Sequence, residues 1–524
     1  MNEITQSRFI MLLKNVAKAL WRGFKKHPVI FVTVIMIMCV LRAYIQPEAL
    51  YIRKHFFNVL LVVAVGLLIM RWIKRKRLIP ILVTAGIVAS VSFVVVKFGC
   101  EPHYFNTLFA QYHSLDKELL DQMPQTRHER IHPLVSIQTM AGAVVADVEH
   151  VVEPHYVKFH DDYCWTLGVE PQFSIRRLSG SINTVFAIPG QATVLDFTGD
   201  HEFKVNFTTG EHMFFFKNAA YLARQSFGLF KFWNYEPADL KYVPGPKGEL
   251  VQILTLTRWK GIIFPKPVFG GVVVFEQDHD GVIGGTFDVI TRLFIGKGEF
   301  ISSDDIQNHD WLVGQNLVSY DVARHIALSF RFHRGYLAPM PFYHLGDVEI
   351  PDLPGDMNEQ PFTSYFKFDN EIHPDKLYHY FAMEPYRKDR QGLALSILVP
   401  SDGIGKMLYA DHKDSRMIGV SPVPTLVRDT RKMYDWSNGY VAEQRPFIRD
   451  IAGKRRYCYL STVVTRQTSD SEQKDSSDNR VGAISGMNTE VVLTDALAKR
   501  PVWVNNLDPN TWEQQMIDEL ADHW

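Results

Sequence analysis

Three long apolar stretches near the N-terminus interrupt an otherwise mixed pattern of hydrophobic and polar residues. They cover about Val29–Ile45, Phe56–Ile73 and Leu78–Val96. Each is close to the roughly 17 to 20 apolar residues that a helix needs to cross a bilayer. We therefore predict a transmembrane region of three helices over residues 28–98. Because Asn58 and Gly66 interrupt the second stretch, a region with only two spans is the alternative.

Residues 1–27 precede the first span and have a different pattern. Within residues 7–26 the apolar side chains fall on one helical face, which is typical of an amphipathic helix. Such helices lie along a membrane surface when the opposite face is basic. The four basic residues predicted to face the membrane surface are Lys14, Lys18, Arg22 and Lys25. Docking of this helix on a protein partner is the alternative.

The distribution of charge predicts the orientation. Residues 1–97 carry 15 Lys and Arg but only two acids, a net charge of +13, and the remainder carries −14. Basic loops stay in the cytoplasm, so the N-terminus and the loop 71–77 are predicted inside. Three spans then place the chain after Phe98 outside, on a plasma (inner) membrane, whereas two spans would leave it in the cytoplasm. The lipid bilayer is the expected partner of the basic end, and the acidic remainder argues against nucleic acid.

After the membrane region the pattern first favours a polar helical connector (99–143) and then short strands. Strands at regular spacing with inserted helices predict a large β-rich domain of sandwich-like or mixed α+β architecture, so the whole is a membrane-anchored α+β protein. An acidic, proline-rich stretch suggests a division into residues 144–345 and 346–524. A polar loop is expected at Thr468–Asn479, and helices at Ala219–Phe227, Val322–His333 and Trp512–Leu520. The predicted strands are His155–His160, Tyr163–Val169, Ser181–Ile188, Thr193–Phe197, Glu202–Phe207, Met213–Phe216, Leu250–Arg258, Gly271–Glu276, Phe287–Phe294, Leu393–Val399, Lys406–Tyr409, Arg455–Thr465 and Glu490–Leu493.

Histidine is dense after the membrane region, and imidazole is a good ligand for zinc or copper. The members of this group are His103, His113, His128, His132, His150, His155 and His160. His155 and His160 are the candidate ligands among them, although no pair has the close HxH or HExxH spacing. Asp278, His279 and Asp280 resemble half of a calcium loop, but the later ligands of such a loop are missing in register. Surface histidines and a polar turn explain both patterns equally well, so no cofactor is expected.

A basic cluster in the C-terminal half is a candidate site for a phosphate or carboxylate ligand. Its members are Arg445, Arg449, Arg455 and Arg456. Pairing with acidic residues of the 347–359 stretch is the alternative. His344–Asp347 resembles a fragment of a metallophosphatase site, but the partner motifs are absent. Four cysteines, Cys39, Cys100, Cys164 and Cys458, are too few for a disulfide scaffold.

These patterns contain no set of residues with the spacing of a nucleophilic, acid–base or dinucleotide-binding motif. The sequence therefore favours a multi-pass membrane protein that is not an enzyme. Its extracytoplasmic β-rich domain would be a structural or interaction subunit of an envelope, secretion or surface assembly, with protein partners or as a homo-oligomer. A membrane-tethered ligand-binding sensor or metal-dependent hydrolase is the alternative function.

Overall fold

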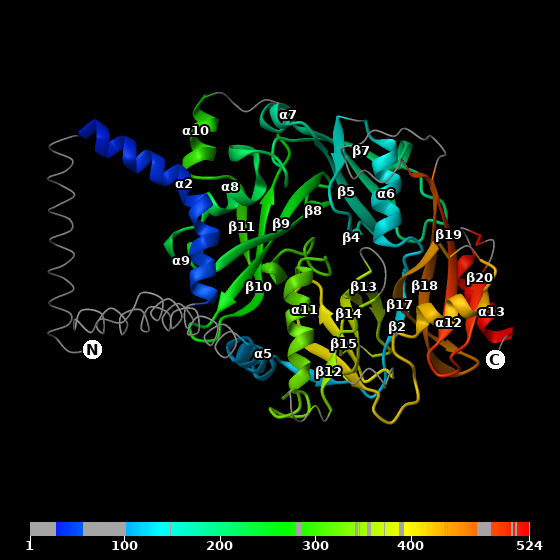
Figure 1. Ribbon diagram of the computed structural model, residues 1–524. Coiled ribbons are helices and arrows are strands. Elements are labelled where there is room, and N and C mark those ends of the chain that lie inside the picture. The colour runs from blue at the N-terminus through cyan, green and yellow to red at the C-terminus, as the bar shows by residue number, and fades with distance from the viewer. Residues whose placement is uncertain are drawn as a thin grey trace, which may run out of the picture.

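Four mostly antiparallel sheets, the helices that pack on them and one long apolar helix near the N-terminus form the part of the chain that the structure describes (Figure 1). This computed structural model describes residues 28–55, 101–146, 148–278, 286–340, 344, 346–353, 358–370, 372–386, 392–434, 436, 437, 439–468, 484–504, 507, 508 and 511–522. The prediction of a mixed, β-rich α+β protein is confirmed.

Helix α2 (Pro28–Lys54) contains the first predicted span and continues beyond its expected end at Ile45. By length and composition it is the one helix in the described ranges that is long and apolar enough to cross a membrane. The second and third predicted spans, within residues 56–100, lie outside the described residues, as do residues 1–27. The structure therefore supports one span, and it does not support the prediction of three.

The two halves of α2 have different surroundings. The first half points away from the rest of the protein, and the second half lies along it beside α8 (Ala219–Ser226) and α9 (Leu229–Phe232) (Figure 1). Gln46 in the second half is fully buried. Its amide donates to the carbonyl oxygens of Phe232 (3.0 Å) and Tyr235 (2.6 Å). The helix is thus an integral part of the fold.

The sheet next to α2 has the order β11-β10-β9-β8. Its strands are β8 (Tyr235–Pro244), β9 (Leu250–Lys260), β10 (Lys266–Phe275) and β11 (Glu299–Ser302). Residues predicted as a strand, Phe287–Phe294, instead belong to helix α10 (Thr286–Phe294). An ion pair one helical turn apart, Arg292 to Asp288 at 2.9 Å, supports this helix.

The five-stranded sheet has the order β3-β5-β6-β7, with β4 also paired to β5. Its strands are β3 (Glu149–Val151), β4 (His155–Phe159), β5 (Asp162–Pro171), β6 (Ile182–Pro189) and β7 (Glu202–Phe207). The short helix α7 (Ser174–Ser179) connects β5 to β6. The structure has no strand at Thr193–Phe197 or at Met213–Phe216, so these two predictions are wrong. The strand that pairs with β6 on this side is β7.

The largest sheet has the order β1-β16-β15-β14-β13-β2, with β12 on β14, and only its β1–β16 pair is parallel. The strands are β1 (Lys117–Leu119), β2 (Gln125–Arg127), β12 (Val348–Glu349), β13 (Phe362–Lys367), β14 (Lys376–Pro385), β15 (Leu395–Pro400) and β16 (Met407–Asp411). Helices α5 (Glu101–Ser114) and α11 (Tyr320–Ser329) pack on each other beside it. The expected helical connector therefore ends at Ser114, and its next residues join the sheet.

The last sheet has the order β17-β18-β19-β20. Its strands are β17 (Gly439–Ile451), β18 (Lys454–Thr468), β19 (Ile484–Asp495) and β20 (Pro501–Val504). Three helices contact it: α6 (Leu134–Val144), α12 (Val423–Thr430) and α13 (Trp512–Asp522). The predicted loop Thr468–Asn479 lies outside the described residues except for Thr468. Short 3-10 helices occur at Gly199–His201, Phe215–Lys217, Ile306–Asn308 and Phe330–Phe332.

Candidate functional site

Two residues with metal-binding side chains face each other across strands β3 and β5. His150 of β3 is the register partner of Glu170 near the end of β5. Directly opposed residues of an antiparallel pair project from the same face of the sheet, with Cβ atoms roughly 5 Å apart. The pairing of these strands therefore brings an imidazole and a carboxylate together.

A turn after β7 adds a second imidazole, and Glu170 holds that turn in place. The buried Glu170 carboxylate accepts the backbone N–H groups of Glu211 (2.6 Å) and His212 (2.8 Å). Gly210 makes this approach possible, because a Cβ atom at this position would lie 2.5 Å from Glu170 Oε1. The same contacts that fix the turn thus position His212 beside the carboxylate.

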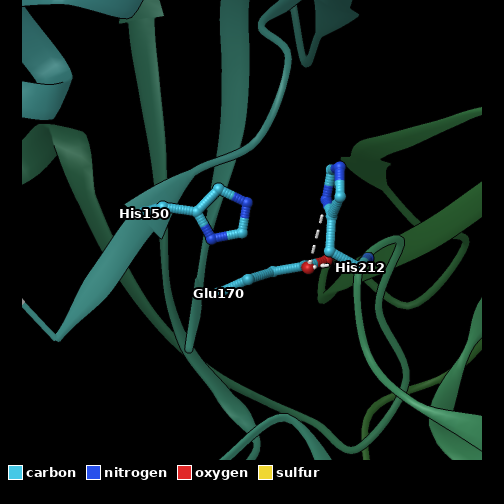
Figure 2. A group of neighbouring side chains, drawn as sticks. All are labelled: His150, Glu170 and His212. Atoms are coloured by element: carbon cyan, nitrogen blue, oxygen red, sulfur yellow. Dashed lines mark hydrogen bonds and ion pairs between the residues drawn. The ribbon is translucent and has the colours of Figure 1, made fainter. Parts of the chain in front are cut away.

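The three side chains converge on one small space (Figure 2). Their ligand atoms, one from each of His150, Glu170 and His212, all lie within 4.8 Å of one another. The two imidazole rings have centroids 4.9 Å apart, and His212 Nδ1 is 3.5 Å from Glu170 Oε2. Within the described ranges no other group of three or more His, Cys, Asp or Glu residues has its ligand atoms this close to one another.

The electrostatic surroundings of the two histidines differ. The hydrogen bond with Glu170 raises the pKa of His212 above its ordinary value. Burial lowers the pKa of His150, so its ring favours the neutral form that binds metals. His150 Nδ1 is buried and has no hydrogen-bond partner among the described residues.

Acidic side chains adjoin this group. Burial, reinforced by Glu170 and other carboxylates, raises the pKa of Glu211 to about 7. Burial likewise raises the pKa values of Glu153 and Asp239, both of which interact electrostatically with Glu211. These carboxylates destabilise one another's charged forms, and the buried Lys241, whose Nζ lies 3.6 Å from Asp239, offsets part of this repulsion.

The metal ligands expected from the sequence are not brought together in this way. His155 is buried on β4, and burial lowers its pKa well below the ordinary value. His160 is exposed in the turn between β4 and β5 at φ 56°. Asp278 forms ion pairs with Arg292 (3.2 Å) and Lys297 (2.5 Å). His279 and Asp280 lie outside the described residues.

The arginines of the predicted anion site pair with carboxylates of the protein itself. Arg449 is 2.6 Å from Glu129 and 2.9 Å from Glu513. The remaining pairs are Arg445 with Glu443 (3.6 Å), Arg455 with Asp450 (2.6 Å) and Asp369 (2.7 Å), and Arg456 with Asp495 (4.0 Å). These acids lie outside the 347–359 stretch that the sequence suggested as partners. Lys14, Lys18, Arg22 and Lys25 lie outside the described residues.

Sequence reasoning singled out His150 only as one of a dense group and missed Glu170 and His212 as ligands. Their positions, 150, 170 and 212, have none of the short spacings that mark metal sites. The one available signal was strand pairing, since a β3–β5 register would have placed His150 opposite Glu170. Comparisons with protein families, with curated proteins and with solved structures found no match.

Proposed function

We propose that this protein is a membrane-anchored, extracytoplasmic protein that binds one divalent transition-metal ion of the zinc class. The observation that carries the proposal is the convergence of His150, Glu170 and His212 within 4.8 Å. Two imidazoles and one carboxylate form a ligand set that suits zinc. The proposal departs from the sequence-based expectation that no metal is bound.

The spacing of the ligand atoms supports a site that closes slightly around its ion. In a tetrahedral zinc site with bonds of about 2.0–2.1 Å, ligand atoms lie about 3.4 Å apart. The exposed ring of His212 can rotate to shorten its distances, whereas Glu170 is held by two backbone N–H groups. Three protein ligands leave a fourth position for water, so the predicted alternative of a metal-dependent hydrolase has a physical basis here.

The contacts of α2 support an anchor that is retained in the mature protein. The exposed apolar side chains from Val29 to Met38 are the part of α2 that a bilayer would cover, since Gln225 of α8 already donates to the carbonyl of Cys39 at 2.9 Å. The next part of the helix docks on the domain through Gln46 and through Arg53, whose guanidinium donates to Trp259 O at 2.8 Å. A signal peptide is removed after export, and its removal here would expose the buried contacts of α2.

Two contacts are compatible with the three-span topology, in which residues 56–100 would cross the membrane twice. Arg53, near the end of α2, donates to the carbonyl of Gly261 (3.2 Å), and His103 in α5 bonds to the carbonyl of Ile263 (2.7 Å). Residues 56–100 therefore start and end at the same edge of the domain, an arrangement that fits two further crossings as well as none. With the crossing by α2 the total is odd, and the basic N-terminus and 71–77 loop would remain in the cytoplasm.

An interaction role in an envelope, secretion or surface assembly remains part of the proposal. Exposed apolar side chains on and beside α7 support it: Phe173 (56%), Ile175 (82%) and Leu178 (42%). Adjacent exposed apolar residues of this kind mark contact surfaces for proteins or membranes. Protein partners or a second copy of the chain would cover them.

Metal binding can be tested with Zn²⁺ and the purified full-length protein. We expect one ion per chain in a competition titration with a chromophoric chelator. His150→Ala and His212→Ala should each weaken binding by at least about tenfold, since each removes one of three ligands. His160→Ala is the matched control, because His160 is an exposed histidine outside the group. Equal affinity in all three variants and the native protein would reject the proposed site.

A further inference from the structure

The turn between β9 and β10 carries an unusual run of apolar side chains. Ile262, Ile263 and Phe264 form it, and 72%, 59% and 37% of their surfaces are exposed. Lys260 and Lys266 flank them in the sequence. Turns are normally built from small and polar residues. Three consecutive apolar residues at this position leave a continuous apolar surface without protein cover in the described structure.

Two aromatic side chains next to α2 extend this surface. Phe230 is 83% exposed and Trp233 is 45% exposed. The guanidinium of Arg53 donates to the carbonyls of both Trp233 and Gly261, and it thereby joins the α9 segment to the turn. We call this surface the apolar rim; its members are Phe230, Trp233, Ile262, Ile263 and Phe264.

The apolar rim lies where the chain leaves the domain and returns to it. α2 ends beside it, as the bonds of Arg53 show. α5 begins beside it, since the ring of His103 lies 5.6 Å from that of Phe264 and its Nε2 bonds to Ile263 O. Both ends of the apolar segment 56–100 therefore adjoin the rim. If that segment enters a membrane, as proposed above, a surface in this position faces the same membrane.

We infer that the apolar rim inserts into the interfacial layer of the lipid bilayer, with Lys260 and Lys266 at the level of anionic headgroups. Apolar residues flanked by cations suit this layer, because the apolar side chains leave water while the ammonium groups stay near phosphate. Tryptophan is also enriched at this depth. The inference rests on the proposed anchoring by α2 and adds a second membrane contact, made by the folded domain itself.

Depth-dependent quenching tests the inference on the full-length protein. It would be reconstituted in vesicles of phosphatidylcholine and phosphatidylglycerol that carry a nitroxide on the acyl chains. A fluorophore would be attached at Ile262→Cys in a Cys39→Ser, Cys100→Ser background, in which the remaining Cys164 and Cys458 are buried. Ile372→Cys is the matched control, because Ile372 is 75% exposed in the turn between β13 and β14. Native Cys39, labelled in a Cys100→Ser protein, reports on the anchor.

We expect quenching at positions 39 and 262 to exceed that at position 372 at least twofold. Lys260→Glu with Lys266→Glu should reduce the quenching at 262 in these vesicles but not in pure phosphatidylcholine. Quenching at 39 but not at 262 would overturn the rim and leave the anchor standing. Absence of quenching at 39 would overturn both. Protection of position 262 from lipid and from water-soluble quenchers alike would show that a protein covers the rim and would overturn the lipid assignment.

Discussion

The side-chain amide of Gln46 donates a 2.6 Å hydrogen bond to the backbone carbonyl of Tyr235, 189 positions later in the chain. It also bonds to the carbonyl of Phe232 at 3.0 Å. A fully buried amide within an apolar helix is costly where its polar atoms lack partners; Nε2 of Gln46 has two, whereas its Oε1 has none among the described residues. The contact therefore selects one docked position for the second half of α2 and couples this helix to the sheet of β8–β11.

Replacing Gln46 by Leu should destabilise this docking. The substitution keeps the apolar character of the helix but removes two hydrogen bonds to buried carbonyls, a cost of about 1–3 kcal/mol. We expect a lower thermal unfolding midpoint and faster proteolysis between α2 and α8 in detergent. Ile45→Ala is the control, because Ile45 is 41% exposed. Equal midpoints for Gln46→Leu and the native protein would contradict the proposed coupling.

Replacing Gly210 by Ala should weaken metal binding without removing a ligand. The added Cβ would lie 2.5 Å from Glu170 Oε1 and 2.8 Å from Met213 Cγ, so the Glu170 carboxylate or the turn must move. We expect at least a tenfold loss of Zn²⁺ affinity by chelator competition. Gly142→Ala is the control, since a Cβ there meets nothing within 4 Å and lies in helix α6. An unchanged affinity in Gly210→Ala would mean that Glu170 does not position the site.

The sequence predicted much of the fold where one segment determines its own structure. Trp512–Leu520 repeats apolar residues at helical spacing and forms α13, and Leu250–Arg258 is rich in β-branched and apolar residues and lies in β9. Phe287–Phe294 is ambiguous because a short apolar run fits a strand or a helix. Its helix is decided by the Asp288–Arg292 pair and by packing on α8.

The candidate site was not predictable from local patterns, because non-local contacts create it. His150 meets Glu170 only through the β3–β5 register, and His212 arrives through a turn that Glu170 itself caps. The predicted arginine cluster shows the opposite case. It is a real local pattern, but Arg449 is used inside the protein, where Glu129 and Glu513 neutralise it.

Truncation of Arg449 should therefore cost stability. Its side chain is 2% exposed and lies 2.6 Å from Glu129, which is itself 4% exposed. Loss of one partner from a buried ion pair costs about 3–5 kcal/mol, because the other charge stays buried without compensation. We expect Arg449→Ala to lower the unfolding midpoint strongly and Arg456→Ala to have a small effect, since Arg456 is 28% exposed and 4.0 Å from Asp495. Similar midpoints for the two variants would refute this assignment.

Buried His379 should make stability depend on pH. Burial lowers its pKa to about 3, and the neutral ring bonds to Thr363 (3.0 Å) and to the carbonyl of Val318 (3.0 Å). The unfolded chain binds a proton near its ordinary pKa of 6.5, which the folded chain does not. The stability contribution is therefore complete above pH 6.5 and is lost as the pH falls from 6.5 toward 3. Its slope is about 1.4 kcal/mol per pH unit.

The measurement for His379 is a difference between variants. Buried carboxyls with raised pKa values, such as Glu211, bind protons more readily in the folded state and give a slope of the opposite sign. We therefore compare the slope of the unfolding free energy against pH in the two proteins between pH 6 and 4. This slope should be less positive in His379→Gln than in the native protein, by about the value stated above. A His379→Gln slope equal to the native one would show that this ring does not resist protonation.

The proposed topology predicts which side of the membrane the domain occupies. Met433 is fully exposed in the described structure, so a cysteine introduced there should react from whichever side holds the domain. With three spans and a basic cytoplasmic N-terminus, a membrane-impermeant maleimide should label Met433→Cys in intact cells or spheroplasts. A cysteine at Ser7, in the N-terminal segment, should be labelled only after lysis.

The reverse labelling pattern would place the domain in the cytoplasm. Labelling of both from outside would mean that the chain between these positions crosses the membrane an even number of times, which would contradict the three-span topology. Neither labelling result would affect the proposal of metal binding, because its test depends on His150, Glu170 and His212 alone.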